Sequence, residues 1–117
     1  MLKARLWYLT DCMVKAEIES VVKKYINVLN DTGLEIKQAY IYGSCARGEN
    51  STDSDIDVML VSDIFDTDDD SILSRPWIYT VKVDPRIEPV AVGSRRFNTD
   101  TGSPLIEIVK KEGVKVM

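Results

Sequence analysis

Residues 42–60, YGSCARGENSTDSDIDVML, contain the change of pattern that decides the fold of this chain. A hydrophobic run stops at Gly43 and Ser44, and the next hydrophobic run begins with two aspartates, Asp55 and Asp57. A buried strand would carry apolar side chains at such positions, because an unpaired carboxylate is costly to remove from water. Something must therefore compensate for two carboxylates that lie so close together.

Asp55 and Asp57 are expected to share one face of a strand, since residues two apart in a strand point the same way. The apolar residues that alternate with them, Ile56, Val58 and Leu60, then face the core. Two neighbouring carboxylates repel each other and raise each other's pKa unless a cation lies between them. An isolated Asp-x-Asp is more often a hydrated turn. Because this pair opens an apolar strand, the sequence favours a ligand set for a divalent ion.

Gly43 and Ser44 precede that pair by ten intervening residues and indicate an anion site. Glycine lets the backbone turn sharply and come close to a ligand. Ser44 is expected to cap a short helix whose N–H groups could hold a phosphate, and Arg47, one turn later, could reach the same anion. In isolation, Gly43-Ser44 is an ordinary turn with an N-cap, and Arg47 could equally be a surface residue.

The rest of the chain predicts helices that alternate with a few strands. The predicted elements are a helix over 15–29 that ends at 30–33, strands over 36–42, 55–61 and 86–93, a loop over 94–102, and a closing helix that starts at Ser103 and Pro104 and ends at Gly113. Residues 72–83 fit either a helix kinked at Pro76 or a strand. The pattern indicates an α/β or α+β fold, a small mixed β-sheet flanked by helices, with the helices expected on one side.

The third predicted strand also carries a carboxylate, Glu88, on an otherwise apolar run. If this strand lies next to the second one, Glu88 supplies a third oxygen donor beside Asp55 and Asp57. Pro89 cannot donate to a strand ladder, so it indicates an edge strand or a strand end.

Length and composition indicate one domain over residues 1–117, in which residues 1–12 could be an N-terminal appendage. The chain is 44% hydrophobic and 29% charged, as ordinary soluble proteins are. No apolar run approaches the roughly 20 residues that a membrane-spanning helix needs, and the first dozen residues lack a signal-peptide pattern. A cytoplasmic location is therefore expected.

The residue inventory narrows the chemistry. The chain has no histidine, which excludes Ser–His and Cys–His catalysis and any histidine-ligated metal. Its two cysteines, Cys12 and Cys45, form neither a disulfide framework nor a zinc pattern. The remaining oxygen donors suit hard cations such as Mg²⁺ or Mn²⁺. A net charge of −4 argues against strong nucleic-acid binding.

Several other conspicuous residues are expected to have structural roles. Trp7 and Trp77 are assigned to the core or to an interface, and Arg95 and Arg96 to a solvated loop. The acidic run 63–70 is assigned to a solvated helix start, where carboxylates are favourable.

The pattern of Gly43-Ser44, ten residues, and Asp55-x-Asp57 resembles the signature of the polymerase-β-type nucleotidyltransferase superfamily. The fuller string YGSCARGENSTDSDIDVMLV resembles the minimal nucleotidyltransferase (MNT) domains of prokaryotes, and DPRIEPVAV resembles the segment that carries their third acid. The resemblance in motifs covers about residues 40–92. It implies the nucleotidyltransferase fold, in which residues 72–83 would be mostly helical.

The resemblance also implies roles for the acids. Asp55 and Asp57 would bind one or two Mg²⁺ ions that bridge the triphosphate of a nucleotide such as ATP. Glu88 would ligate the second metal ion or act as the base on an acceptor hydroxyl, and Asp84 is the alternative for this third acid.

The resemblance assigns the triphosphate to Gly43 and Ser44, with help from Arg47. The implied reaction is in-line attack of a hydroxyl on the α-phosphorus, with pyrophosphate as the leaving group. Two metal ions would stabilise the attacking and the departing oxygen.

The chain is too short for a separate acceptor-binding domain, so the acceptor is expected from a partner protein, a homodimer or an open surface. MNT domains are typically paired with a HEPN-domain protein in toxin–antitoxin modules. The resemblance implies an antitoxin that transfers AMP from ATP to a tyrosine of a HEPN-type toxin. The alternatives are a non-catalytic antitoxin that acts by contact alone and a transferase that modifies a small molecule such as an aminoglycoside antibiotic.

Overall fold

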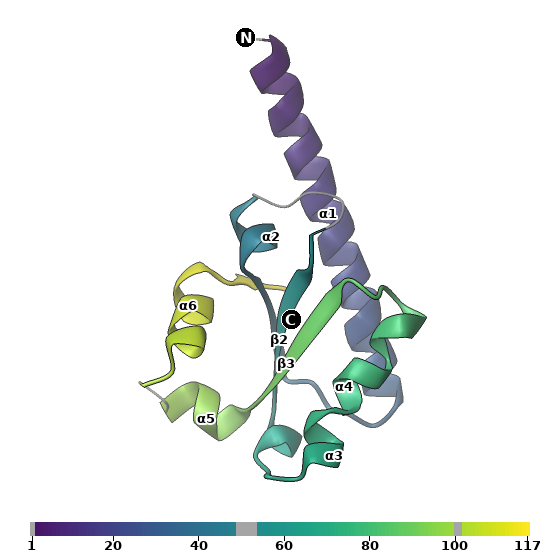
Figure 1. Ribbon diagram of the computed structural model, residues 1–117, viewed down its shortest axis with the longest axis vertical. Coiled ribbons are helices and arrows are strands. Elements are labelled where there is room, and N and C mark those ends of the chain that lie inside the picture. The colour runs from purple at the N-terminus through teal and green to yellow at the C-terminus, as the bar shows by residue number, and fades with distance from the viewer. Residues whose placement is uncertain (1, 49–53, 100–101) are drawn as a thin grey trace.

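The computed structural model describes the backbone of residues 2–48, 54–99 and 102–117, with side chains from Ala16 onward (Figure 1). The elements are α1 (Leu2–Asp31), β1 (Gln38–Tyr42), α2 (Ser44–Arg47), β2 (Ile56–Ser62), η1 (Asp63–Phe65), α3 (Asp70–Leu73), α4 (Arg75–Ile78), η2 (Thr80–Lys82), β3 (Ile87–Gly93), α5 (Ser94–Thr99), α6 (Pro104–Glu112) and β4 (Val114–Lys115).

The strands form one mixed sheet in the order β3-β2-β1-β4. Strand β1 is antiparallel to both β2 and β4, whereas β2 and β3 are parallel. A parallel pair needs a crossover between its strands, and here η1, α3, α4 and η2 provide it. Strand β3 lies at an edge of the sheet, which confirms the position that Pro89 indicated.

Apolar side chains from alternate strand positions are buried on both faces of the sheet, which we name by their covering helices. On the α1 face the strand residues are Ala39, Ile41, Ile56, Val58, Leu60 and Ile87. On the α6 face Tyr42, Met59, Val61 and Val92 pack with Phe97, Ile106 and Val109. Figure 1 shows α5 and α6 well separated from α1. The expectation that helices cover only one side was therefore wrong.

Helix α1 is longer than the predicted 15–29, because it runs from Leu2 to Asp31. Its C-terminal half packs on the sheet through the buried side chains of Ile18, Val22, Tyr25, Ile26 and Leu29. Its N-terminal half extends beyond the sheet (Figure 1). That residues 1–12 are an appendage stays a prediction. Among the described residues, no helix is long and apolar enough to cross a membrane.

Residues 72–83 are mostly helical, as the resemblance implied, in spite of their β-branched content. Tertiary contacts decide this ambiguous segment. The hydroxyl group of Tyr25 donates a hydrogen bond to the carbonyl oxygen of Pro76 at 2.5 Å, and this buried bond joins α4 to α1.

The C-terminal part of the chain departs from the predictions in two places. Residues 94–99 form helix α5 rather than a loop, since Phe97 is buried and stacks on Tyr40 with ring centroids 5.4 Å apart. Strand β4 was not predicted. It is only two residues long, and its pairing continues through the Val116 N–H, which donates to the Ala39 carbonyl at 2.9 Å.

Candidate active site

Two of the predicted acids lie side by side where β2 and β3 begin. Asp57 and Glu88 are paired in register across the parallel strands, and Tyr42 is the partner of Asp57 on the other side. Tyr42, Asp57 and Glu88 therefore form a row across three strands. Alternation along β2 places Asp57 on the α6 face with Met59 and Val61, as the period of two predicted.

Asp55 is the third member of the acidic group. It is the residue just before β2, and it is exposed. Burial raises the pKa of Asp57, the negative charge of Asp55 raises it further, and a hydrogen bond with Glu88 partly offsets the increase. Burial likewise raises the pKa of Glu88, and the charges of Asp55 and Asp57 and hydrogen bonds with both carboxyl groups add to it. The structure thus brings Asp55, Asp57 and Glu88 together with mutual repulsion.

Gly43 joins β1 to α2 and contacts this acidic group closely. Its φ is +74°, in the region that favours glycine, and a Cβ atom at this position would lie 2.4 Å from Asp57 Oδ2. The structure thus requires glycine here for a close approach to Asp57. The predicted close approach of this turn to a ligand stays a prediction. The predicted cap was wrong, because Gly43 occupies the N-cap of α2 without a side-chain hydrogen bond and Ser44 is the first helical residue.

Cys45 fixes the end of β1 against the start of β2. Its buried thiol donates a hydrogen bond to the Asp55 carbonyl oxygen at 3.4 Å. Burial raises the pKa of the Cys45 thiol, and the charge of Asp57 adds to this, although nearby Arg86 and a hydrogen bond with Ser44 lower it. The thiol is therefore neutral near pH 7 and has a structural role in holding the glycine turn beside the acids.

Tyr42 is also neutral in this environment. Burial and the charges of Asp57 and Glu88 raise its pKa to about 12. A neutral phenol adds no further negative charge to the row.

Arg47 lies on α2, and its Nη1 is 3.7 Å from Glu112 Oε2. Both side chains are about half exposed, so this pair links α2 to the end of α6 only weakly. Its predicted role as a phosphate ligand stays a prediction.

Asp84, the alternative third acid, is bound to Arg86. The Arg86 Nη2 lies 2.8 Å from Asp84 Oδ2, and the Arg86 Nε and backbone N–H donate to Asp84 Oδ1 at 3.1 and 2.9 Å. These hydrogen bonds lower the pKa of Asp84. The Arg86 carbonyl oxygen in turn accepts from the Ile56 N–H at 2.8 Å, between the two aspartates. Glu88 rather than Asp84 thus stands in the acidic row. Arg86 was not singled out from the sequence, although the spacing Asp84-x-Arg86 was a signal for this pair.

The oxygen donors suit Mg²⁺ as part of a ligand shell. No group of three or more acidic, thiol or imidazole side chains in the described parts of the chain is arranged to enclose a metal ion. Mg²⁺ in nucleotide sites is usually bound by one or two carboxylates together with phosphate oxygens and water. Asp57, in register with Glu88 and with Asp55 two residues away, fits such a partial shell.

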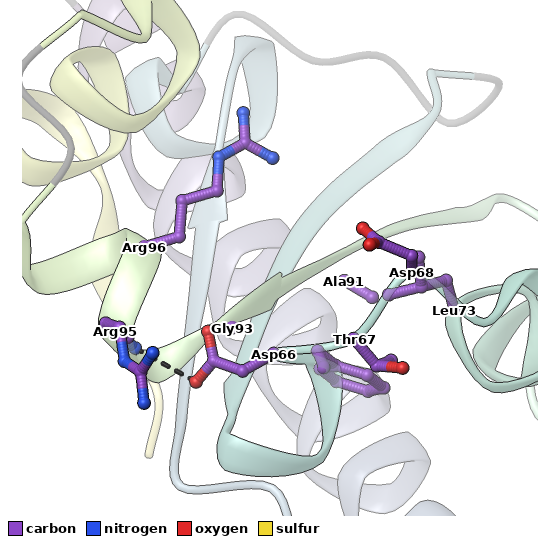
Figure 2. A pocket seen from close by; sticks show the side chains of 9 residues that line it. Asp66, Thr67, Asp68, Leu73, Ala91, Gly93, Arg95 and Arg96 are labelled. Atoms are coloured by element: carbon purple, nitrogen blue, oxygen red, sulfur yellow. Dashed lines mark hydrogen bonds between the residues drawn. The ribbon is translucent and has the colours of Figure 1, made fainter.

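A cavity among the described residues lies elsewhere. It has a volume of about 440 Å³ and is lined by Phe65, Asp66, Thr67, Asp68, Leu73, Ala91, Gly93, Arg95 and Arg96. Figure 2 shows these side chains around the end of β3, where the Arg95 N–H donates to Asp66 Oδ2 at 3.1 Å. Gly93 ends β3 whereas Glu88 lies near its start. The cavity therefore contributes nothing to the acidic group.

Comparison with protein families gives one match over more than half of the chain. The family described as "Polymerase beta, Nucleotidyltransferase" matches residues 17–82, a range that includes Gly43, Ser44, Asp55 and Asp57 but not Glu88. No curated protein sequence gives a significant match.

Two solved structures share the fold. A Sulfolobus solfataricus protein assigned as a nucleotidyltransferase superposes with a TM-score of 0.63 at 15% identity, over 90% of this chain and 84% of that one. A chain of a toxin–antitoxin structure with AMP-PNP superposes with a TM-score of 0.59 at 20% identity, over 85% of this chain and 72% of that one. At these identities the superpositions establish the nucleotidyltransferase fold.

We predict that Gly43→Ala destabilises the chain by about 2 kcal/mol, because the new Cβ combines strain at positive φ with a clash against the Asp57 carboxylate. Gly48→Ala is the matched control, since Gly48 has a φ of +71° but no atom of the described residues would lie within 4 Å of its Cβ. Urea unfolding of both variants measures the difference. Equal losses of stability would show that the close approach to Asp57 has no energetic weight.

We predict that Asp57→Asn raises the Tm of the ligand-free chain by a few degrees at pH 7. A carboxyl group whose pKa is raised in the folded state contributes stability that is present below its unfolded pKa and is lost as the pH rises through the folded pKa. The gain from the substitution should therefore shrink toward pH 4. Thermal unfolding by circular dichroism across this range measures it, and a gain that grows on acidification would contradict the assignment.

Proposed function

Since the chain belongs to the polymerase β nucleotidyltransferase family, we propose that it transfers AMP from ATP to a hydroxyl group of a HEPN-type partner protein, as the antitoxin of a toxin–antitoxin pair. The observation that carries this proposal is the row of Asp57 and Glu88, with Asp55 beside it, next to the glycine turn at Gly43. The toxin–antitoxin structure with AMP-PNP, which shares the fold, supports the nucleotide class and the kind of partner.

The three acidic residues divide between two tasks in this proposal, metal binding and proton transfer. Asp55 and Asp57 hold Mg²⁺ (or Mn²⁺) together with the triphosphate, and the ion, when bound, neutralises charge on the phosphate oxygens. In the ligand-free chain the negative charges of these acids repel one another. A bound metal ion would remove this repulsion, which favours binding of the ion. Gly43 lets the turn approach the phosphates, and Ser44 and Arg47 are the candidates for contacts to them.

Glu88 is the proposed general base. Its raised pKa makes it a better proton acceptor than an ordinary glutamate. It takes the proton of the acceptor hydroxyl as the hydroxyl oxygen forms a bond to the α-phosphorus. The bond from the α-phosphorus to the bridging oxygen breaks at the same time, and pyrophosphate leaves. The products are an AMP ester of the acceptor and pyrophosphate, so all atoms are accounted for.

The test of this function is transfer of label from α-³²P-ATP with Mg²⁺ to the purified protein encoded by the neighbouring gene. We expect the double variant Asp55→Asn with Asp57→Asn to lower the rate at least a hundredfold, since the loss of both carboxylates removes several kcal/mol of transition-state stabilisation. The double variant Asp68→Asn with Asp70→Asn has the same spacing at exposed positions and should behave as the wild type.

Transfer that survives the loss of Asp55 and Asp57 would refute the catalytic proposal. A double variant that fails to transfer AMP but still neutralises the toxin would instead favour the antitoxin that acts by contact alone. Resistance to an aminoglycoside in cells that express the chain would favour a small-molecule acceptor.

We predict that Glu88→Gln lowers kcat at least tenfold with little change in ATP affinity, because it removes the base and leaves Asp55 and Asp57 in place. Asp84→Asn should keep kcat and lose only about 1 kcal/mol of stability or less, through the weakened pair with Arg86. Steady-state kinetics as a function of pH measures both variants, and the acidic limb of the wild-type profile should be absent in Glu88→Gln. The reverse pattern, with Asp84 essential and Glu88 dispensable, would exchange the two roles.

A further inference from the structure

Three large apolar side chains are exposed on the outer side of α4 and η2. The exposed fractions are 50% for Trp77, 62% for Ile78 and 74% for Val81. The inner side of the same segment is buried through Pro76 and Thr80. We call Trp77, Ile78 and Val81 the α4 patch. Trp77 was predicted to lie in the core or at an interface, and its exposure excludes the core. Contiguous exposed apolar side chains are typical of interaction sites.

The α4 patch is held in a fixed position. The buried hydrogen bond from the Tyr25 hydroxyl to the Pro76 carbonyl joins its helix to α1. The Thr80 hydroxyl donates to the Trp77 carbonyl at 2.9 Å and connects α4 with η2. A surface that is already ordered loses little conformational entropy when a partner binds, which favours affinity.

The rim of the α4 patch is basic, although the chain as a whole has a net charge of −4. Arg75 in α4 and Lys82 in η2 bracket the patch along the chain, and residues 71–83 contain no carboxylate. Asp70 and Asp84 flank this stretch, and Asp84 is paired with Arg86. Just outside this stretch, Asp69 lies close enough to Arg75 for that charge to lower its pKa. The complementary partner surface is therefore apolar at its centre and carries carboxylates at its rim, opposite Lys82 above all.

The α4 patch lies at the same end of the sheet as the acidic group. Residues 83–86 connect η2 to β3, and Glu88 is the second residue of β3. This connection is tight, since the Asp84 N–H donates to the Thr80 carbonyl at 2.8 Å and the Ile87 N–H donates to the Asp84 carbonyl at 3.2 Å. The helix of the patch packs on the α1 face, whereas Glu88 belongs to the α6 face. Because β3 is an edge strand, a protein bound on the patch can reach Glu88 by extending past that edge.

We propose that the α4 patch is the docking surface for the acceptor protein, which binds it through an apolar surface rimmed by carboxylates and extends past the edge strand β3 to present its hydroxyl group to Glu88. This inference rests on the proposed function for the identity of the acceptor. A second copy of the chain is a poorer occupant, because two copies with a charge of −4 repel each other and a two-fold contact at Trp77 brings equal basic rims together. An anionic lipid surface is also disfavoured by the net charge.

The experiment measures, by surface plasmon resonance, how tightly the protein encoded by the neighbouring gene binds the wild type and single variants. We expect Val81→Glu and Lys82→Glu each to raise the Kd at least tenfold. Val81→Glu places a carboxylate against the apolar centre of the partner, and Lys82→Glu places one against its acidic rim. The controls are Ile108→Glu and Lys111→Glu on α6, where Ile108 is also an exposed apolar residue, with 43% exposure. These should stay within twofold of the wild type.

Two further measurements separate docking from catalysis. By calorimetry with Mg²⁺ and ATP alone, Val81→Glu should bind ATP as the wild type does. In transfer kinetics, Val81→Glu should raise only the KM for the protein acceptor. Unchanged affinity of Val81→Glu and Lys82→Glu, or no binding by the wild type, overturns the docking proposal. The docking proposal is also overturned if light scattering shows a wild-type dimer that Val81→Glu dissociates, because the occupant is then a second copy. It is likewise overturned if the wild type binds phosphatidylserine vesicles and Val81→Glu does not, because the occupant is then a lipid surface. Transfer that survives without Asp55 and Asp57 refutes the proposed chemistry instead and leaves the docking result unaffected.

Discussion

The central constraint on this structure is a group of carboxyl groups at one end of the sheet. No basic side chain stands in the strand-to-strand row that they share. Tyr42, Asp57 and Glu88 are in register across β1, β2 and β3, and the row contains a neutral phenol and two carboxyl groups with raised pKa values. Such a group would be a cost without benefit in a purely structural protein. The neighbouring features reduce that cost or use it: Gly43 leaves room for the Asp57 carboxylate, and the Asp84–Arg86 pair lies beside the start of both strands.

The two halves of the acidic group come from segments far apart in the chain, so the parallel pairing of β2 and β3 has to be correct to one residue. A slip by one residue would turn Glu88 to the opposite face of the sheet. The crossover through α3 and α4 fixes this register. Its buried bond from Tyr25 to Pro76 anchors the crossover on α1, and its C-terminal turn closes through Asp84 onto Thr80. The packing of α4 thus determines where Glu88 stands relative to Asp57.

Local periodicity made a large part of this arrangement predictable. The period of two in β2 gave the face of Asp57, and the apolar run around Glu88 gave a third strand, whose place beside β2 only the structure established. Segments whose conformation depends on distant contacts were not predictable from pattern. Helix α5 has a single buried anchor, Phe97, and β4 is two residues long, so neither contains enough residues to show a period. The position of Asp84 was equally hidden, because its distinction from Glu88 depends on the Arg86 side chain and on the register.

Two features reduce the stability of the isolated folded chain: its clustered carboxyl groups and its exposed apolar patch. Carboxylates with raised pKa values make the folded state less favourable as the pH rises, and the exposed apolar side chains of the α4 patch are unfavourable in water. Both costs would decrease on assembly: a nucleotide with its metal ion would compensate the acids, and a partner protein would cover Trp77, Ile78 and Val81. Binding to the folded state alone stabilises that state in proportion to the free energy of binding. The chain would then reach its greatest stability only when nucleotide and partner protein are both bound.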